Sequence, residues 1–105
     1  KVITLLKNNS QDSDTAMFYI SDHGESLGEG GLYLHGMPYF MAPEEQIKIP
    51  AFMWFDEGLK KVFDIDAIKK NSELEKSHDN LFHTLLGLMD VETELYQKDM
   101  DIATK

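Results

Sequence analysis

The chain has 105 residues, of which 42% are hydrophobic and 28% charged, an ordinary composition for one small globular domain or a piece of a larger one. Its formal net charge of −9 and its lack of arginine exclude a basic surface that could clamp a nucleic-acid backbone. The lack of cysteine excludes disulfides and thiolate metal ligands, and no apolar run reaches the roughly 18 to 20 residues that a membrane span needs.

The first part of the chain predicts a helix, a strand and a long loop. Residues 2–6 read as the end of an amphipathic helix, because the Asn and Ser residues that follow compete for backbone hydrogen bonds. Residues 15–20 form a short apolar run, which is typical of a strand buried on both faces in a parallel or mixed sheet. Residues 21–36 are rich in glycine and follow no period of 2 or 3.6, so we expect a long loop of the kind that carries function.

The middle of the chain predicts a second strand between short helices. Residues 42–46 contain a proline and two acids at positions typical of the first turn of a helix, so we expect a short helix there. Pro50 then opens residues 51–55, a second candidate for a buried strand. Residues 56–63 and 64–70 are expected to form short helices or turns. Helices and buried strands in this order predict an α/β layer fold.

The last part of the chain predicts one clear helix and a tail. A polar connection at residues 71–76 leads to Ser77, the expected N-cap of this helix. Its apolar side chains recur at helical spacing and are expected to pack on the sheet: Phe82, Leu85, Leu86 and Met89. Residues 92–105 are expected to be an irregular polar tail, with the acidic run at 90–101 solvated.

A pair of residues directly after the first strand, Asp22 and His23, carries the candidate chemistry. In an open α/β sheet ligands bind outside the carboxyl ends of the strands, which is where this pair stands. One oxygen and one nitrogen ligand form a mix that suits zinc, and Gly24 allows the turn that would bring both to one ion. By spacing alone such a pair is more often a turn with a surface histidine, because zinc wants three or four protein ligands.

Gly24-Glu25-Ser26-Leu27-Gly28 offers a competing interpretation, because it matches the nucleophile elbow of serine hydrolases. The elbow needs a strand that runs into the first glycine and a helix that leaves the second. The apolar run stops at Ile20 and the glycines after residue 28 start a helix poorly, so the sequence disfavours a serine nucleophile.

A longer pattern resembles a known family. Its parts are residues 19–29 (YISDHGESLGE), residues 31–36 (GLYLHG) with Pro38-Tyr39, and Ala42-Pro43 and Gln46 ahead of Ile49-Pro50. Together they resemble the signature of lipid A phosphoethanolamine transferases, which belong to the alkaline phosphatase-like superfamily. Residues 77–88 (SHDNLFHTLLGL) resemble the final core helix of the same family.

The resemblance implies a fold and a set of site residues. Residues 1–105 would be a C-terminal fragment of a sulfatase-like catalytic domain, the last part of an α/β sheet flanked by helices. Asp22 and His23 would be two ligands of a catalytic Zn2+, with an acid and a nucleophilic threonine supplied by an earlier part of the enzyme. His35 would be catalytic and would bind the substrate head group or a second zinc, and Glu25 would contact the ethanolamine amine or a metal. No threonine of this chain matches the nucleophile's motif.

The resemblance also implies a reaction and partners. Phosphoethanolamine would pass from phosphatidylethanolamine to lipid A, with the remainder of the enzyme as partner and no nucleic acid. The enzyme would sit in the bacterial inner membrane through segments outside this chain, with its catalytic domain facing the periplasm. Two alternatives stay open: another alkaline phosphatase-like enzyme, such as a sulfatase or a phosphoglycerol transferase, and a metal-free folding or interaction unit when the piece is isolated. Outside the loop, His83 is expected at the edge of the core and His78 on the surface.

Overall fold

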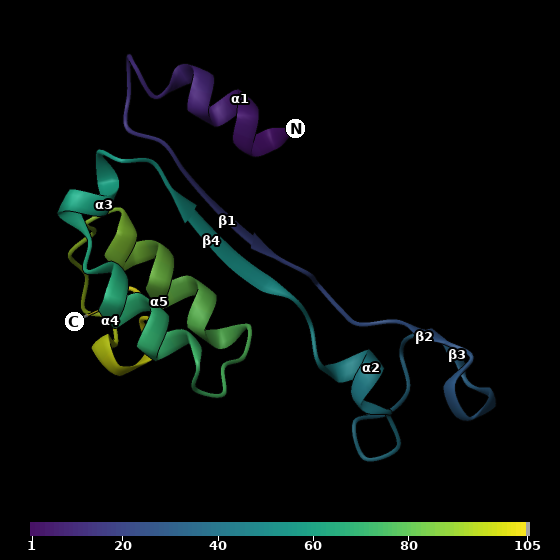
Figure 1. Cartoon of the computed structure of the whole chain (residues 1–105). Helices are drawn as coiled ribbons and strands as arrows, with labels where there is room; N and C mark the ends of the chain where they lie inside the picture. Colours follow the sequence, from purple (N-terminus) through teal and green to yellow (C-terminus); the bar gives the residue numbers. More distant parts are fainter. Residues whose placement is uncertain (105) are drawn as a thin grey trace. The chain divides into compact units, whose positions relative to one another are not determined.

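The computed structural model describes residues 1–104, which form two compact units, one of Lys1–Phe55 and one that begins at Asp56. Figure 1 shows the elements of each unit in chain order. Within the described residues, none of the helices has the length and apolar character that crossing a membrane requires.

The first unit contains the predicted helices and strands. Its elements are α1 (Val2–Asn9), β1 (Ala16–Ile20), β2 (Ser26–Leu27), η1 (Glu29–Gly31), β3 (Tyr33–Leu34), α2 (Glu44–Ile47) and β4 (Ala51–Phe55). The helix at the start, both predicted strands and the short helix after the Ala-Pro pair are therefore confirmed.

The main sheet of this unit pairs β1 with β4. The strands are antiparallel, and the register places Tyr19 opposite Phe52 with their rings stacked and the centroids 5.0 Å apart. The prediction that these strands are buried on both faces is wrong for this chain, because Tyr19 and Phe52 are 45% and 48% exposed. Two paired strands cannot cover each other's faces, since both lie in one layer.

The glycine-rich segment is more regular than the sequence predicts. Strands β2 and β3 pair as a small antiparallel hairpin, with Ser26 opposite Leu34. The chain reverses through η1, where Gly28, Gly30 and Gly31 have φ values of 125°, 61° and 79°. Only glycine adopts such values without strain, and this is why a segment without a strand-like pattern can still form a hairpin.

The second unit is helical. Its elements are α3 (Leu59–Val62), α4 (Ile65–Ser72), α5 (Asp79–Leu88) and η2 (Lys98–Met100), which confirms the two short helices and the last helix. The Asp64 side chain caps α4 by accepting from the Ala67 N–H at 2.9 Å. The N-cap position of α5 is His78 rather than Ser77, although the Ser77 hydroxyl still accepts from the Asp79 N–H at 3.2 Å.

The prediction that the apolar face of α5 is buried is wrong for this chain. Phe82, Leu85 and Met89 are 51%, 42% and 73% exposed. The residues of α5 that are buried are Asn80, His83 and Thr84, so the expected core-edge position of His83 is confirmed. Polar side chains occupy this face because they bind the backbone of the segment that follows the helix.

The end of that segment is not a solvated tail, so the prediction of a solvated tail is wrong for residues 100–104, while Glu92, Glu94 and Asp99 are exposed as predicted and Lys105 lies outside the described residues. Asp101 and Ile102 are only 4% and 9% exposed. The Asn80 side chain donates to Met100 O at 2.9 Å, and the Ile102 N–H donates to the Thr84 hydroxyl at 3.0 Å. Backbone groups that leave water need such partners, and α5 supplies them from its polar face.

Thr84→Val is expected to destabilise the protein by about 1 to 3 kcal/mol. The Thr84 side chain is fully buried, and its hydroxyl accepts from Ile102 N–H while donating to Asn80 O at 2.7 Å. Valine keeps the shape but leaves the buried Ile102 N–H without an acceptor. Thr4→Val is the matched control, because Thr4 is an exposed helical threonine in α1. Urea unfolding measures both variants, and an equal effect in the two would contradict the role assigned to Thr84.

Candidate metal centre

The candidate centre begins where the chain leaves β1. The Ser21 N–H donates to Pro50 O at 3.2 Å, which keeps this segment beside the start of β4. Gly24 then lies against α2, where its N–H donates to Gln46 O at 3.2 Å. A Cβ atom at Gly24 would lie 2.0 Å from Glu45 O, so only glycine permits this approach. The chain bends at Asp22, and backbone packing on α2 explains why glycine follows the Asp-His pair.

The His23 ring is held in one tautomer. Its Nδ1 lies 2.7 Å from Gly24 O, and a carbonyl oxygen can only accept, so Nδ1 carries the proton of the neutral ring. The lone pair of the ring is therefore on Nε2. A backbone carbonyl behind the ring is the usual way in which proteins orient a histidine that binds a metal. The Ser21 hydroxyl adds a second restraint by donating to His23 O at 2.8 Å.

Asp22 places a carboxylate beside that lone pair. Its Oδ2 lies 3.9 Å from His23 Nε2, and its Oδ1 accepts from the His23 N–H at 3.1 Å. Two ligands of a tetrahedral zinc ion, each about 2.0 to 2.2 Å from the metal, lie roughly 3.3 to 3.5 Å apart. The Asp22 side chain is 90% exposed, so it can close the remaining gap by a small rotation.

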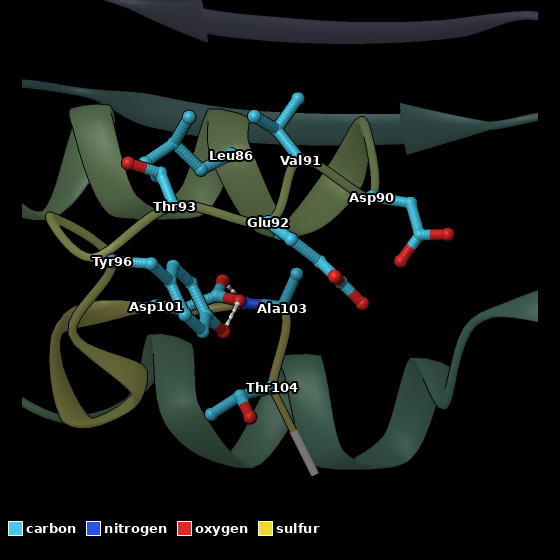
Figure 2. Close-up of a pocket in the computed structure, with 10 residues that line it drawn as sticks. Leu86, Asp90, Val91, Glu92, Thr93, Tyr96, Asp101, Ala103 and Thr104 are labelled. Carbon is cyan, nitrogen blue, oxygen red and sulfur yellow. Dashed lines mark hydrogen bonds between the residues drawn. The ribbon is translucent and has the colours of Figure 1, made fainter.

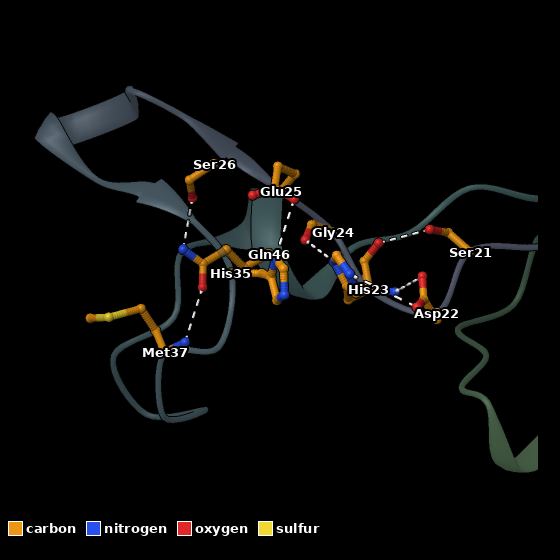
Figure 3. A network of polar contacts seen from close by, with 9 residues as sticks. All are labelled: Ser21, Asp22, His23, Gly24, Glu25, Ser26, His35, Met37 and Gln46. Atoms are coloured by element: carbon orange, nitrogen blue, oxygen red, sulfur yellow. Dashed lines mark hydrogen bonds and ion pairs between the residues drawn. The ribbon is translucent and has the colours of Figure 1, made fainter.

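Glu25 and His35 lie next to this pair (Figure 3). Glu25 Oε2 is 3.2 Å from His35 Nδ1, and the His35 ring stacks on the His23 ring with centroids 3.8 Å apart. His23, Glu25 and His35 offer ligand atoms that all lie within 4.8 Å of one another. The structure thus brings the four predicted site residues together, with Asp22 linked to the other three through His23. Their nitrogen and oxygen donors fit zinc.

Gln46 holds the centre together, and sequence reasoning gave it no role. Its buried side chain donates to the Ser26 hydroxyl at 2.9 Å and accepts from the Met37 N–H at 3.3 Å, so it ties α2 to β2 and to the segment that follows β3 (Figure 3). The only available signal was its place in the Ala-Pro-x-x-Gln string. Ser26 is 1% exposed and engaged by Gln46, which argues against the serine-nucleophile interpretation.

The hairpin tip carries two further features of the centre. Glu29 Oε2 accepts from the Leu27 N–H at 2.7 Å, and hydrogen bonds from its own backbone N–H and from that of Leu27 lower the pKa of Glu29. Leu34 has a φ of 67°, an uncommon value for a bulky residue, directly before His35. Backbone strain of this kind clusters at functional sites.

A pocket of about 410 Å3 lies elsewhere, between the end of α5 and the segment after it (Figure 2). Its lining includes Asp90, Glu92 and Asp101, but none of the predicted site residues. Tyr96 donates to Asp101 Oδ2 at 2.6 Å, and this bond raises the pKa of Tyr96. Three carboxylates repel an anionic ligand, so the loop after β1 remains the candidate site.

Comparison with known proteins shows the family of the chain. The sulfatase family model matches residues 1–91. The chain belongs to the sulfatase family. This sulfatase-family chain is 47% identical over 105 residues to the phosphoethanolamine transferase EptA of Escherichia coli K12, a match that covers 97% of the chain and 19% of EptA. It thus spans about a fifth of the length of that relative.

Two solved structures share the fold. The C-terminal periplasmic domain of phosphoethanolamine transferase EptC from Campylobacter jejuni superposes with a TM-score of 0.85 at 44% identity, over 98% of this chain and 32% of that one. The integral membrane protein lipooligosaccharide phosphoethanolamine transferase A from Neisseria meningitidis superposes with a TM-score of 0.81 at 39% identity. This match covers 97% of this chain and 21% of that one. The predicted α/β, alkaline phosphatase-like fold and the resemblance to phosphoethanolamine transferases are confirmed.

Proposed function

We propose that the chain is the C-terminal part of the catalytic domain of a zinc-dependent transferase that moves phosphoethanolamine from phosphatidylethanolamine to lipid A. The observation that carries this proposal is the His23 ring, oriented by Gly24 O with its free Nε2 beside Asp22 at the end of β1. The family and the similar phosphoethanolamine transferases support the same reaction class. The nucleophile is a threonine in a part of the enzyme outside this chain.

Asp22 and His23 would hold the zinc ion. When bound, zinc neutralises charge on the phosphoryl oxygens and lowers the pKa of the threonine hydroxyl. The contribution of this chain to the ion is the fixed direction of the His23 lone pair and an exposed carboxylate at Asp22. An ordered histidine loses little entropy on binding the ion, and the exposed carboxylate adjusts the distance.

Glu25 and His35 would act on the substrate. With its Nδ1 proton directed at Glu25 Oε2, a protonated His35 can donate the proton on Nε2 to the oxygen that leaves phosphorus. The Glu25 carboxylate orients the His35 ring through this contact, as the acid of a catalytic triad does for its histidine. The same carboxylate is a charge partner for the ethanolamine ammonium group.

The proposed location is the bacterial inner membrane, with this domain facing the periplasm. Similar structures are described as a C-terminal periplasmic domain and as an integral membrane protein, which supports this placement. The exposed face of α5 and the open β1–β4 sheet would be covered by the remainder of the catalytic domain.

Removal of zinc from the full-length parent is expected to lower phosphoethanolamine transfer by more than about 100-fold. The assay follows labelled headgroup from phosphatidylethanolamine to lipid A before and after chelation, and mass spectrometry of the metal gives the zinc content. Zinc, but not magnesium, should restore the activity, because the donors include imidazole nitrogen. Full transfer by metal-free protein would contradict the zinc centre, and cleavage of a sulfate ester without transfer would favour a sulfatase.

A further inference from the structure

We propose that the turn at residues 37–43, which we name the aromatic turn, lies in the headgroup region of the bilayer that holds the donor lipid. This inference rests on the proposed function and adds to it a membrane contact made by this chain itself. The side chains that make the contact are Tyr39, Phe40 and Met41.

The aromatic turn presents large apolar side chains to solvent from an ordered backbone. Tyr39, Phe40 and Met41 are 84%, 86% and 57% exposed. The N–H groups of Met41 and Ala42 both donate to Pro38 O, at 2.8 and 2.9 Å, and close the turn. Consecutive exposed apolar residues on a soluble surface mark a site of contact with another molecule or with a membrane.

The base of the aromatic turn is tied to the candidate centre. The Met37 N–H donates to Gln46 Oε1, and the same Gln46 side chain holds Ser26 in the hairpin (Figure 3). His35 lies two residues before Met37 on the same stretch of chain. Contact between the turn and a surface would therefore fix the position of His35 relative to that surface.

The charge pattern selects the kind of surface. Residues 32–43 contain no Asp, Glu or Lys, although 28% of the whole chain is charged. Tyrosine and other amphipathic or apolar side chains are favoured at the level of lipid headgroups. The acids that flank the segment, Glu29 and Glu44, would be repelled by anionic lipid. The turn therefore fits a zwitterionic surface such as one of phosphatidylethanolamine.

The chemistry of the proposed donor points to the same contact. Every methylene of an acyl chain that is lifted into water costs free energy, so a phospholipid stays in the bilayer while its phosphate reacts. The catalytic residues must then reach the headgroup layer. Among the described residues around the centre, the aromatic turn combines a lack of charged side chains with the most exposed apolar side chains, Tyr39 and Phe40.

The test places a reporter on the turn in the full-length parent, freed of other reactive cysteines and reconstituted in phosphatidylethanolamine and phosphatidylcholine vesicles. Phe40→Cys carries an environment-sensitive fluorophore, and Leu74→Cys, at an apolar residue 61% exposed, carries the same fluorophore as control. Spin-labelled lipid should quench the fluorophore at position 40 at least about twofold more than the one at position 74. Equal quenching would overturn the proposal. The proposal would also be overturned if the emission of the fluorophore at position 40 showed that water is excluded while spin-labelled lipid did not quench it. The remainder of the enzyme would then cover the turn.

Phe40→Ser in the same parent gives a second readout. We expect KM for phosphatidylethanolamine in vesicles to rise roughly tenfold with kcat unchanged, because the turn binds the surface and takes no part in the reaction. With a water-soluble short-chain donor the variant and the parent should have the same KM. A KM in vesicles unaffected by the substitution would contradict the proposal. Failure of the transferase proposal would show as absent transfer in the parent, while the quenching result would still decide the membrane contact.

Discussion

Asp22→Ala and His23→Ala are each expected to lower phosphoethanolamine transfer by the full-length parent more than about 100-fold and to release its zinc. Loss of a residue that merely orients a metal ligand costs about 10- to 100-fold, so loss of a ligand itself should cost more. We expect His23→Ala to lower the zinc content more than Asp22→Ala does, because the His23 Nε2 is already oriented by the contact of the ring with Gly24 O. Labelled headgroup transfer and metal analysis on the same preparations measure both effects.

The matched control is His78→Ala, which removes an exposed histidine at the start of α5. It should keep the zinc content and the transfer rate of the parent. Circular dichroism checks that each variant is folded. If Asp22→Ala and His23→Ala both keep full zinc and full activity, the Asp-His pair is only a turn and the proposed function is wrong.

The candidate centre could be predicted because its residues are close in sequence. Asp22, His23 and Glu25 follow one strand, and His35 returns to them through a hairpin only ten residues away from Glu25. Short separations leave few geometries open, and the family pattern named the same four residues. The role of Gln46 could not be predicted, because it depends on two side-chain hydrogen bonds that cross between elements.

The second unit shows where periodicity misleads. The apolar spacing in α5 marks a real stripe, but Phe82 and Met89 are exposed and the polar side of the helix is buried. Thr84 and Asp101 are buried because each meets backbone N–H groups of a segment that has no periodic pattern of its own. A hydrophobic pattern predicts which face of a helix packs against another element. It does not predict whether that element lies within these 105 residues.

Gly24→Ala is expected to lower transfer by the full-length parent about 10- to 100-fold, without removal of any metal ligand. A Cβ atom at this position would lie 2.0 Å from Glu45 O and 2.9 Å from the Gln46 backbone, and backbone atoms cannot move aside as a flexible side chain can. The segment must then move away from α2. Because Gly24 O orients the His23 ring, the shift turns Nε2 away from Asp22. Overpacking of this kind also costs about 1 to 3 kcal/mol of stability.

Gly58→Ala separates the clash from a general effect of replacing glycine. Gly58 has φ −68° and ψ −56°, which alanine adopts readily, so this variant should be as active as the parent and at least as stable. Thermal unfolding, zinc affinity and transfer rate are compared for the two variants. Weaker zinc binding by Gly24→Ala alone would place the effect at the His23 ring. Unchanged zinc affinity and transfer in Gly24→Ala would contradict the orientation of His23 by Gly24, since the carbonyl that orients the ring cannot keep its place when the backbone beside α2 moves.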